Sequence, residues 1–311
     1  MPAIHRPLAA ALWMTGSIAA FSAMAVAGRE VSGVHDTFEI MIWRSLVGLI
    51  IVLGVAGPAG RLREITTDRL GQHLVRNLFH FTGQNLWFWA LTMIPLAQVF
   101  ALEFTSPVWV ILLSPFFLGE RMTAVRAMAA ALGFAGILIV ARPDFTALDP
   151  GVAAAAAAAI CFAATIILTK ALTRGESTVS ILFWLTGMQL CFGLIAGGID
   201  GAMTWPTAAT LPWLALIGLC GVTAHLCLTT ALSLASASIV VPIDFARLPV
   251  IAVVGMLVYN EPLDAGVFLG GAVILLANIL NIRAANRAAR QQPERALAQQ
   301  VDNDKIVTPR H

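Results

Sequence analysis

Seven polar side chains that can carry chemistry interrupt long apolar segments of this sequence. They are Arg44, His80, Gln84, Glu103, His225, Asp244 and Arg247. If those segments cross a lipid bilayer, an ionisable group near a span centre costs about 2.5–3.5 kcal/mol on insertion scales, so it is expected to face a partner or a cavity. The set marks either structural ion pairs or a site that engages a small solute or protons, and both interpretations stay open.

Spacing suggests how four of these charges pair. Counted from the span centres, Arg44 and Glu103 both lie roughly 5 Å toward the same membrane face, so we expect them to approach each other. Asp244 and Arg247 are three residues apart, which places them on one face of a helix. The Arg247 fork can clamp a carboxylate or phosphate, while Asp244 can hold that arginine or bind an amine or a proton.

The two histidines lie at a similar estimated depth. His80 belongs to a polar stripe with helical spacing, formed by Asn77, His80, Gln84 and Trp87. Such a stripe lines a cavity or forms hydrogen bonds between helices. By depth His80 and His225 are level with Asp244, which makes proton handling a candidate role beside the more common one of structural histidines.

Prolines and aromatic residues gather around the same charges. Pro107, Pro242 and Pro249 each remove a helix hydrogen bond near Glu103 or Asp244. The freed carbonyls can serve a ligand, or the prolines are ordinary membrane kinks. The aromatic side chains near the expected cavity are Trp43, Trp87, Phe100 and Trp184. They suit a flat or apolar organic group, and core packing explains them equally well.

The elements that position these residues are membrane-spanning helices. Hydrophobic residues make up 59% of the 311-residue chain and charged residues 12%, against about 25% charged in a soluble domain. Ten apolar segments have roughly the 20 residues that a helix needs to cross a bilayer. They are 8–28, 38–56, 74–93, 96–118, 123–141, 151–172, 178–199, 211–233, 236–258 and 264–282.

The two ends of the chain need separate interpretation. The first apolar segment ends near Ala25-Val26-Ala27, which resembles a signal-peptidase site. Its length is that of a span, so we expect the segment to be retained. Residues 283–311 are polar and rich in arginine and glutamine, and predict a disordered cytoplasmic tail.

The distribution of basic residues predicts the orientation. With the N-terminus in the cytoplasm, fifteen of the nineteen Lys and Arg residues lie inside and only Arg29 and Arg142 lie outside; the other two are Arg44 and Arg247 within spans. Cytoplasmic loops carry such an excess of positive charge. The asymmetry predicts both termini in the cytoplasm and a multi-pass protein of the inner or plasma membrane.

The sequence also contains an internal repeat. Shifting it by 141 residues aligns Trp43 with Trp184, Phe21 with Phe162, Phe104 with Phe245 and Glu103 with Asp244. Each half has five spans, an odd number, so the halves have opposite orientations. The predicted fold is therefore an all-α integral membrane protein, with ten transmembrane helices as two inverted five-helix repeats, 8–141 and 151–282.

An inverted repeat favours a carrier. Two similar halves of opposite orientation can exchange conformations at nearly equal energy, which opens a central site to one side and then the other. We therefore expect a secondary transporter of a small organic metabolite, such as an amino acid, a vitamin or a nucleotide-like solute, that works by alternating access.

Two motifs extend this interpretation. The fourth span ends in Phe117-Leu118-Gly119-Glu120-Arg121, and Tyr259-Asn260-Glu261-Pro262 follows the ninth. With the repeat, they resemble the drug/metabolite transporter superfamily, EamA type. The resemblance implies a ten-helix carrier in which helices 1–4 and 6–9 surround a cavity and helices 5 and 10 are peripheral. Asn260 stands where a glycine is expected, so the second motif is partly degraded.

Other functions find less support. The sequence lacks the motifs of hydrolases, metalloproteases and ATP-driven pumps. The alternative is a membrane-embedded enzyme or a channel, and transport kinetics would distinguish either one from a carrier. We expect no catalytic residue, cofactor, metal or nucleic-acid partner. The expected partners are a small-molecule substrate, the bilayer, coupled protons, and a second copy through the Gly266-x-x-x-Gly270 helix.

Topology is directly testable. Reporter fusions at positions 150 and 290 should give opposite signals, because the 142–150 loop is predicted outside and the tail inside. A reporter active only in the cytoplasm, paired with one active only outside it, makes the measurement. The same compartment at both positions would contradict the assignment.

Overall fold

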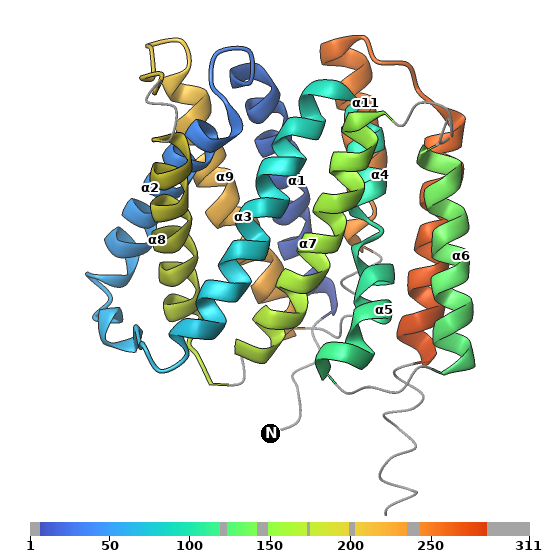
Figure 1. The fold of residues 1–311 in the computed structure, drawn as a ribbon, viewed down its shortest axis with the longest axis horizontal. Helices are drawn as coiled ribbons and strands as arrows, with labels where there is room; N and C mark the ends of the chain where they lie inside the picture. Colours follow the sequence, from blue (N-terminus) through green and yellow to red (C-terminus); the bar gives the residue numbers. More distant parts are fainter. Residues whose placement is uncertain are drawn as a thin grey trace, which may run out of the picture.

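Apolar segments satisfy their own backbone hydrogen bonds as helices, and the computed structural model is built in that way (Figure 1). It describes residues 7–118, 123–141, 149–172, 175–198, 203–234 and 243–284. Within these ranges the regular elements are all helical. The Gly119-Glu120-Arg121 part of the first motif, Pro242, Arg142 and the tail from 285 lie outside the described residues.

Helices occupy the described part of each of the ten predicted spans. They are α1 (Pro7–Val31), α2 (Thr37–Ala56), η1 (Leu62–Glu64), α3 (Leu70–Met93), α4 (Leu96–Glu103), α5 (Ser106–Leu118), α6 (Ala124–Ala141), α7 (Pro150–Leu172), α8 (Thr178–Gly197), α9 (Leu211–Leu234), α11 (Arg247–Tyr259) and a last helix, Ala265–Ala284. The fourth span is divided between α4 and α5. The described part of the ninth span is mainly α11, since residues 236–242 lie outside the described ranges.

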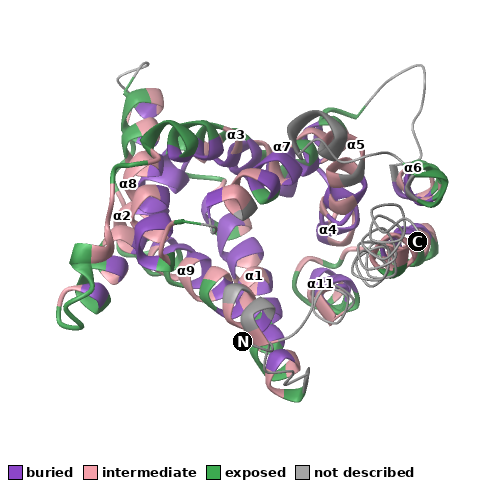
Figure 2. Ribbon diagram, turned by 90° about the horizontal axis from the view of Figure 1, so that it is seen from below, coloured by how far each residue is buried: buried purple, intermediate pink, exposed green. Residues whose placement is uncertain are grey.

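Six of the described helices are long and apolar enough to cross a membrane by length and hydropathy alone. Although α3 is long enough, it is not one of them, because its inward face carries Arg76, Asn77, His80 and Gln84, all of them buried. The opposite face exposes apolar side chains such as Leu78. The helix is thus polar toward the bundle and apolar toward the lipid, an arrangement suited to a polar cavity (Figure 2).

The packing follows the inverted repeat. Helix α1 packs along α9, and α3 packs along α7, which is the same pairing with the two halves exchanged. The pairs α2 with α8 and α4 with α11 join equivalent helices of the two halves. The all-α fold of two inverted five-helix repeats is thereby confirmed.

Both equivalent spans are broken at the same place. The fourth span turns at Phe104, between α4 and α5, and the ninth turns at Phe245, just before α11. Pro107 cannot donate to the carbonyl of Glu103, but the Ser106 hydroxyl does, at 2.7 Å. The Thr105 hydroxyl donates to the preceding carbonyl, that of Leu102, at 2.6 Å, and the Thr105 backbone N–H donates to the same oxygen.

These hydrogen bonds correct one expectation. The carbonyls freed near Pro107 already have partners in the chain, so they are not bare ligands for a substrate. Pro249 lies in the first turn of α11, where a missing N–H costs little. Asn260 ends α11 in the left-handed conformation, with φ 52°. Asparagine tolerates this conformation better than most residues, which explains how it replaces the expected glycine.

Helix α6 and the last helix stand side by side at the edge of the bundle (Figures 1 and 2). Gly136 and Gly270 form their close contact: a Cβ on Gly270 would lie 2.8 Å from the Gly136 carbonyl oxygen. Gly270 therefore packs within this chain, and the homodimer through its helix stays a prediction.

Helix α8 offers a matched test of close packing. A Cβ on Gly193 would lie 2.8 Å from the Ile42 side chain and 3.3 Å from its backbone nitrogen, whereas one on Gly187 would meet nothing within 4 Å. We expect Gly193→Leu to lower the free energy of unfolding by about 1–3 kcal/mol or more, because α2 must move away.

Gly187→Leu, on the same helix, is the control and should cost far less. Denaturant unfolding of both variants in detergent makes the comparison. If both variants lose the same free energy of unfolding, the close approach of α2 and α8 at Gly193 is not the cause of the loss.

Candidate functional site

The two halves of the repeat meet at an arginine held by two carboxylates. One Nη of Arg247 donates to Glu103 at 3.2 Å and to Asp244 at 2.9 Å. Glu103 ends α4 and Asp244 precedes α11, so each carboxylate lies at the break in its own span. These two acids are equivalent positions of the inverted repeat, and Arg247 joins them. We call these three residues the junction.

Aromatic rings enclose the junction. The guanidinium carbon of Arg247 lies 4.7 Å from the ring centroid of Phe21, 5.1 Å from that of Phe100 and 4.9 Å from that of Phe104. Phe104 stacks on Phe245, its repeat equivalent, with centroids 4.5 Å apart. These rings attract the cation and exclude lipid from it.

The junction has a negative surplus. Its two carboxylates face one guanidinium, and Trp87 stabilises Glu103 further through an indole hydrogen bond of 2.9 Å. One acid can therefore accept a proton, or a cationic group can bind, without leaving the arginine unpaired.

The expected pair of Arg44 with Glu103 is wrong. Glu103 pairs with Arg247, and the described residues contain no ion pair between Arg44 and any carboxylate. Equal depth along the membrane normal brings two side chains together only if their helices also turn those side chains toward each other. Arg44 instead faces α9, where a Cβ on Gly221 would lie 3.1 Å from its Nε.

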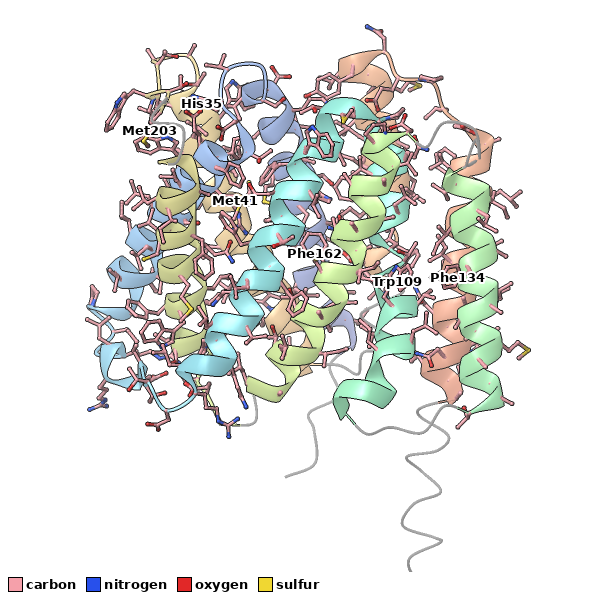
Figure 3. All side chains as sticks on the ribbon, in the orientation of Figure 1. His35, Met41, Trp109, Phe134, Phe162 and Met203 are labelled. Carbon is pink, nitrogen blue, oxygen red and sulfur yellow. The ribbon has the colours of Figure 1, made fainter. Side chains whose placement is uncertain are left out.

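The two histidines do come together. His80 on α3 and His225 on α9 have ring centroids 5.9 Å apart. Phe21 packs edge-on against His225 at 5.7 Å, and its repeat equivalent Phe162 contacts His80 at 6.1 Å. Phe162 lies at mid-height of the bundle (Figure 3). Because Phe21 also touches Arg247, one row of rings joins the histidine pair to the junction.

Sequence analysis missed Arg76, which it placed only on the cytoplasmic flank. Arg76 is buried on α3, donates to Thr169 on α7 at 3.0 Å and to Asn77 at 3.1 Å. Its spacing of four residues from His80 continues the polar stripe of α3 and could have revealed it. Gln84 lies on the same buried stripe, and its amide nitrogen has no hydrogen-bond partner among the described residues.

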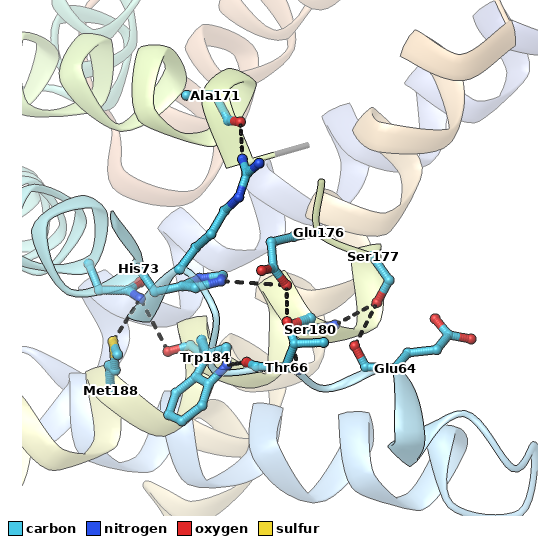
Figure 4. Close-up of polar contacts among 11 residues, drawn as sticks. Glu64, Thr66, His73, Ala171, Glu176, Ser177, Ser180, Trp184 and Met188 are labelled. Carbon is cyan, nitrogen blue, oxygen red and sulfur yellow. Dashed lines mark hydrogen bonds and ion pairs between the residues drawn. The ribbon is translucent and has the colours of Figure 1, made fainter. Parts of the chain in front are cut away.

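A set of contacts closes the lower end of the bundle in Figure 1, where α1 begins (Figure 4). Thr66 donates its hydroxyl to Glu176 at 2.7 Å and accepts from the Trp184 indole at 2.7 Å. Burial alone would raise the pKa of Glu176, but hydrogen bonds from Thr66 and Ser180 and the charges of His73 and Arg69 together lower it. We call these residues the lower clasp.

The opposite end has an equivalent arrangement, the upper clasp. His35 contacts Glu39 at 3.2 Å and Thr210 at 3.0 Å, and Glu39 also accepts from the Thr204 backbone. Figure 3 shows His35 near Met203 at this end. Asp36 caps α2 and its repeat equivalent Ser177 caps α8, so both clasps are built on the same local motif.

Glu261 of the second motif belongs to a further contact at the upper end. It forms an ion pair with Arg29 and accepts from the Leu96 backbone at 2.9 Å, at the start of α4. Arg29 also donates to the carbonyls of Leu91 and Ile94, each at 2.6 Å. Glu261 thus links the end of α1 to the turn between α3 and α4. This is a structural role at the upper end of the bundle.

The aromatic residues divide between these places. Trp87 and Phe100 lie at the junction, whereas Trp184 is in the lower clasp and Trp43 packs on Trp205 beside the upper clasp, with centroids 6.0 Å apart. A cavity of about 530 Å³ opens at the upper end, lined by residues that include His35, Asp36 and Trp89. None of the seven predicted site residues lines it.

The pairing at the junction is testable by a double-mutant cycle. Arg247→Gln alone should lower the free energy of unfolding by about 3–5 kcal/mol, because it leaves two buried carboxylates without a cation. Glu103→Gln alone should cost less, because Asp244 still pairs with Arg247. The double variant should lose less than the sum, by about 0.5–3 kcal/mol.

The control cycle combines Arg44→Gln with Glu103→Gln. These residues do not touch, so their effects should add to within about 0.5 kcal/mol. Denaturant unfolding in detergent measures both cycles. Suppose instead that the effects of the Glu103 and Arg247 variants add, and that those of the Glu103 and Arg44 variants do not. That result would restore the Arg44–Glu103 pair that equal depth suggests.

Comparison with known proteins adds the family. The model of the EamA-like transporter family matches residues 8–142 and again 149–283. A riboflavin transporter of Brucella anthropi is 31% identical over 81% of this chain and 89% of its own length. An S-adenosylmethionine uptake transporter of Rickettsia bellii is 26% identical over 89% of this chain and 94% of its own.

A solved structure supports the fold alone. It is 18% identical, superposes with a TM-score of 0.64, and covers 90% of this chain and 98% of its own. Because the relatives are transporters rather than enzymes, the carrier interpretation is confirmed over the membrane-enzyme alternative. The chain is a multi-pass membrane transporter of small metabolites and belongs to the EamA-like transporter family.

Proposed function

We propose that this chain moves a flat heteroaromatic metabolite across the inner membrane, in the chemical class of riboflavin or S-adenosylmethionine, with a proton exchanged at the junction. The observation that carries the proposal is the interior row from Arg247 through Phe21 to His225 and His80. It combines ring faces, which bind an aromatic solute, with charged and polar groups that orient it.

The similar proteins are consistent with this class. One is named for riboflavin and another for S-adenosylmethionine, and both solutes contain a flat heteroaromatic ring. The interior row lies where the two repeats meet, which is where carriers built from inverted repeats bind their substrates.

Alternating access follows from the two clasps. Both are closed in this structure, which suits an occluded conformation. Opening the lower clasp alone would expose the row to one side, and opening the upper clasp alone would expose it to the other. Their equivalence under the repeat makes the two open conformations similar in energy.

Proton coupling is proposed at Glu103 and Asp244. Two carboxylates share one arginine across the interface of the repeats, so protonation of either one leaves the other paired. Movement of one half against the other changes both hydrogen bonds together. A proton taken up on one side can thereby bias which clasp opens.

Orientation and boundaries complete the proposal. Both termini lie in the cytoplasm, as the distribution of Lys and Arg indicates. The repeats span 8–141 and 151–282, and residues 283–311 form a cytoplasmic tail. The homodimer remains a proposal that size measurements in detergent would test.

Uptake of radiolabelled riboflavin and S-adenosylmethionine into proteoliposomes tests this function. Saturable uptake of at least one of them is expected. Asp244→Asn should flatten the pH dependence of uptake, because it removes one of the two proton acceptors. Arg247→Lys should weaken affinity about tenfold or more, because lysine keeps the charge but loses the fork.

Asp68→Asn is the control, since Asp68 is exposed in the α2–α3 loop. It should leave affinity and pH profile unchanged. Variants at Asp244 and Arg247 that insert normally and transport with the affinity and pH profile of the parent would refute the role of the junction.

A further inference from the structure

Two buried arginines have no carboxylate partner among the residues that the structure describes. Arg44 on α2 is 6% exposed and Arg76 on α3 is 4% exposed. Neither forms an ion pair with an acidic side chain in the described ranges. The hydrogen-bond partners of Arg76 in the described part of the chain are neutral: the Thr169 hydroxyl and the Asn77 amide oxygen. The Nε of Arg44 has no hydrogen-bond partner there.

The two histidines share this region. Arg76 lies about one helical turn from His80 on α3, and the His80 and His225 rings are 5.9 Å apart. His225 and Arg44 line the same small cavity. His80 is 3% exposed, and its two ring nitrogens lack hydrogen-bond partners among the described residues. Arg44, Arg76, His80 and His225 therefore form one cluster of nitrogen donors, contributed by α2, α3 and α9. We call it the basic pocket.

A small cavity lies beside the Arg44 guanidinium. Its lining is Arg44, Ser45, Gly48, Leu182, Leu185, Thr186, Gly218, Gly221, Val222 and His225. Its volume of about 10 Å³, as space open to the centre of a water molecule, is room for one water. Gly221 makes the space, because a Cβ there would lie 3.1 Å from Nε and 3.3 Å from Nη2 of Arg44.

The charge balance here is the opposite of that at the junction. The junction has two carboxylates for one arginine, whereas the basic pocket has two arginines and no carboxylate. Both groups border the stripe of α3, and the helix rise places Arg76 and Trp87 about 16 Å apart along it. The interior is thus positive at one end of the stripe and negative at the other.

An unpaired buried charge is expensive, and a second one nearby adds repulsion. Membrane proteins keep such groups where they contact a solute. Guanidinium groups bind phosphate and carboxylate through parallel hydrogen bonds, and a histidine donor strengthens the site. An anion is the ligand that removes the excess charge and supplies the missing acceptors together.

We propose that the basic pocket, which has room for one water in this closed conformation, opens to bind the anionic group, a phosphate or a carboxylate, of the transported metabolite. This rests on the proposed transport function and narrows its substrate class from flat heteroaromatic solutes in general to those that carry an anionic group. The aromatic part of the solute then lies along Phe21 and Gln84 toward the junction.

A first test needs no knowledge of the substrate. If Arg44 exists for a ligand, Arg44→Met should raise the unfolding temperature of the purified full chain without added solute, by roughly 3 °C or more, since it removes a buried unpaired charge. If Arg44 is structural, the same change should lower that temperature, and the proposal is overturned. Arg61→Met, on an exposed loop, is the control and should shift it little.

A second test uses matched probes that differ by one phosphate. They are riboflavin with riboflavin 5′-phosphate, and adenosine with adenosine 5′-monophosphate. For at least one pair the parent protein should bind the phosphate form tenfold tighter or more, and Arg44→Met or Arg76→Gln should reduce that preference to under about threefold. Absence of any phosphate preference in both pairs overturns the proposal.

The two proposals fail in different ways. Saturable uptake of riboflavin that is insensitive to Arg44→Met would leave the transport function standing and remove the anionic substrate class. Saturable uptake of neither riboflavin nor S-adenosylmethionine, with tight binding of a phosphate form, would instead retain the basic pocket and refute the proposed transport of those two solutes.

Discussion

The pairing of Arg247 with one carboxylate from each half of the repeat organises this molecule. A guanidinium near the middle of a bilayer is costly, and here carboxylates and ring faces from both halves replace water around it. Glu103 and Asp244 can reach one arginine because both spans break beside them, at Phe104 and Phe245. The stacked pair of phenylalanines and the shared arginine therefore fix how the halves meet.

The inverted repeat is only approximate at its centre, and the departures carry the function. The position equivalent to Arg247 is Ser106, which satisfies a carbonyl of its own broken helix. Likewise α3 contributes Arg76 where the second half has an isoleucine, Ile217. A perfectly symmetric interior would present the same charge to a solute at both ends. The unequal residues instead place negative charge at the junction and positive charge beside Arg44, and we propose that this difference orients a bound solute.

Hydropathy and helical periodicity predicted most of the fold, because a bilayer allows few backbone arrangements. The ten spans, the repeat that relates the two halves and the polar stripe of α3 were all visible in the sequence. The partner of Glu103 was not. Depth along the membrane normal is one coordinate, and the direction in which a side chain points around its helix requires knowledge of packing. Arg76 was missed for a related reason, since a basic residue near a helix end is normally explained by topology. The clasps depend on loops, such as the one containing Thr66, whose contacts no periodicity reveals.

Reciprocal movement of the two clasps is the central claim, and distances between spin labels measure it directly. In a chain without Cys161, Cys191, Cys220 and Cys227, labels at Val34→Cys with Ala208→Cys span the upper clasp, and labels at Arg63→Cys with Thr178→Cys span the lower one; all four positions are exposed. Double electron–electron resonance in lipid should show that when pH or substrate lengthens one distance, the other stays short. Both distances lengthening together, or neither changing while transport proceeds, would contradict the account.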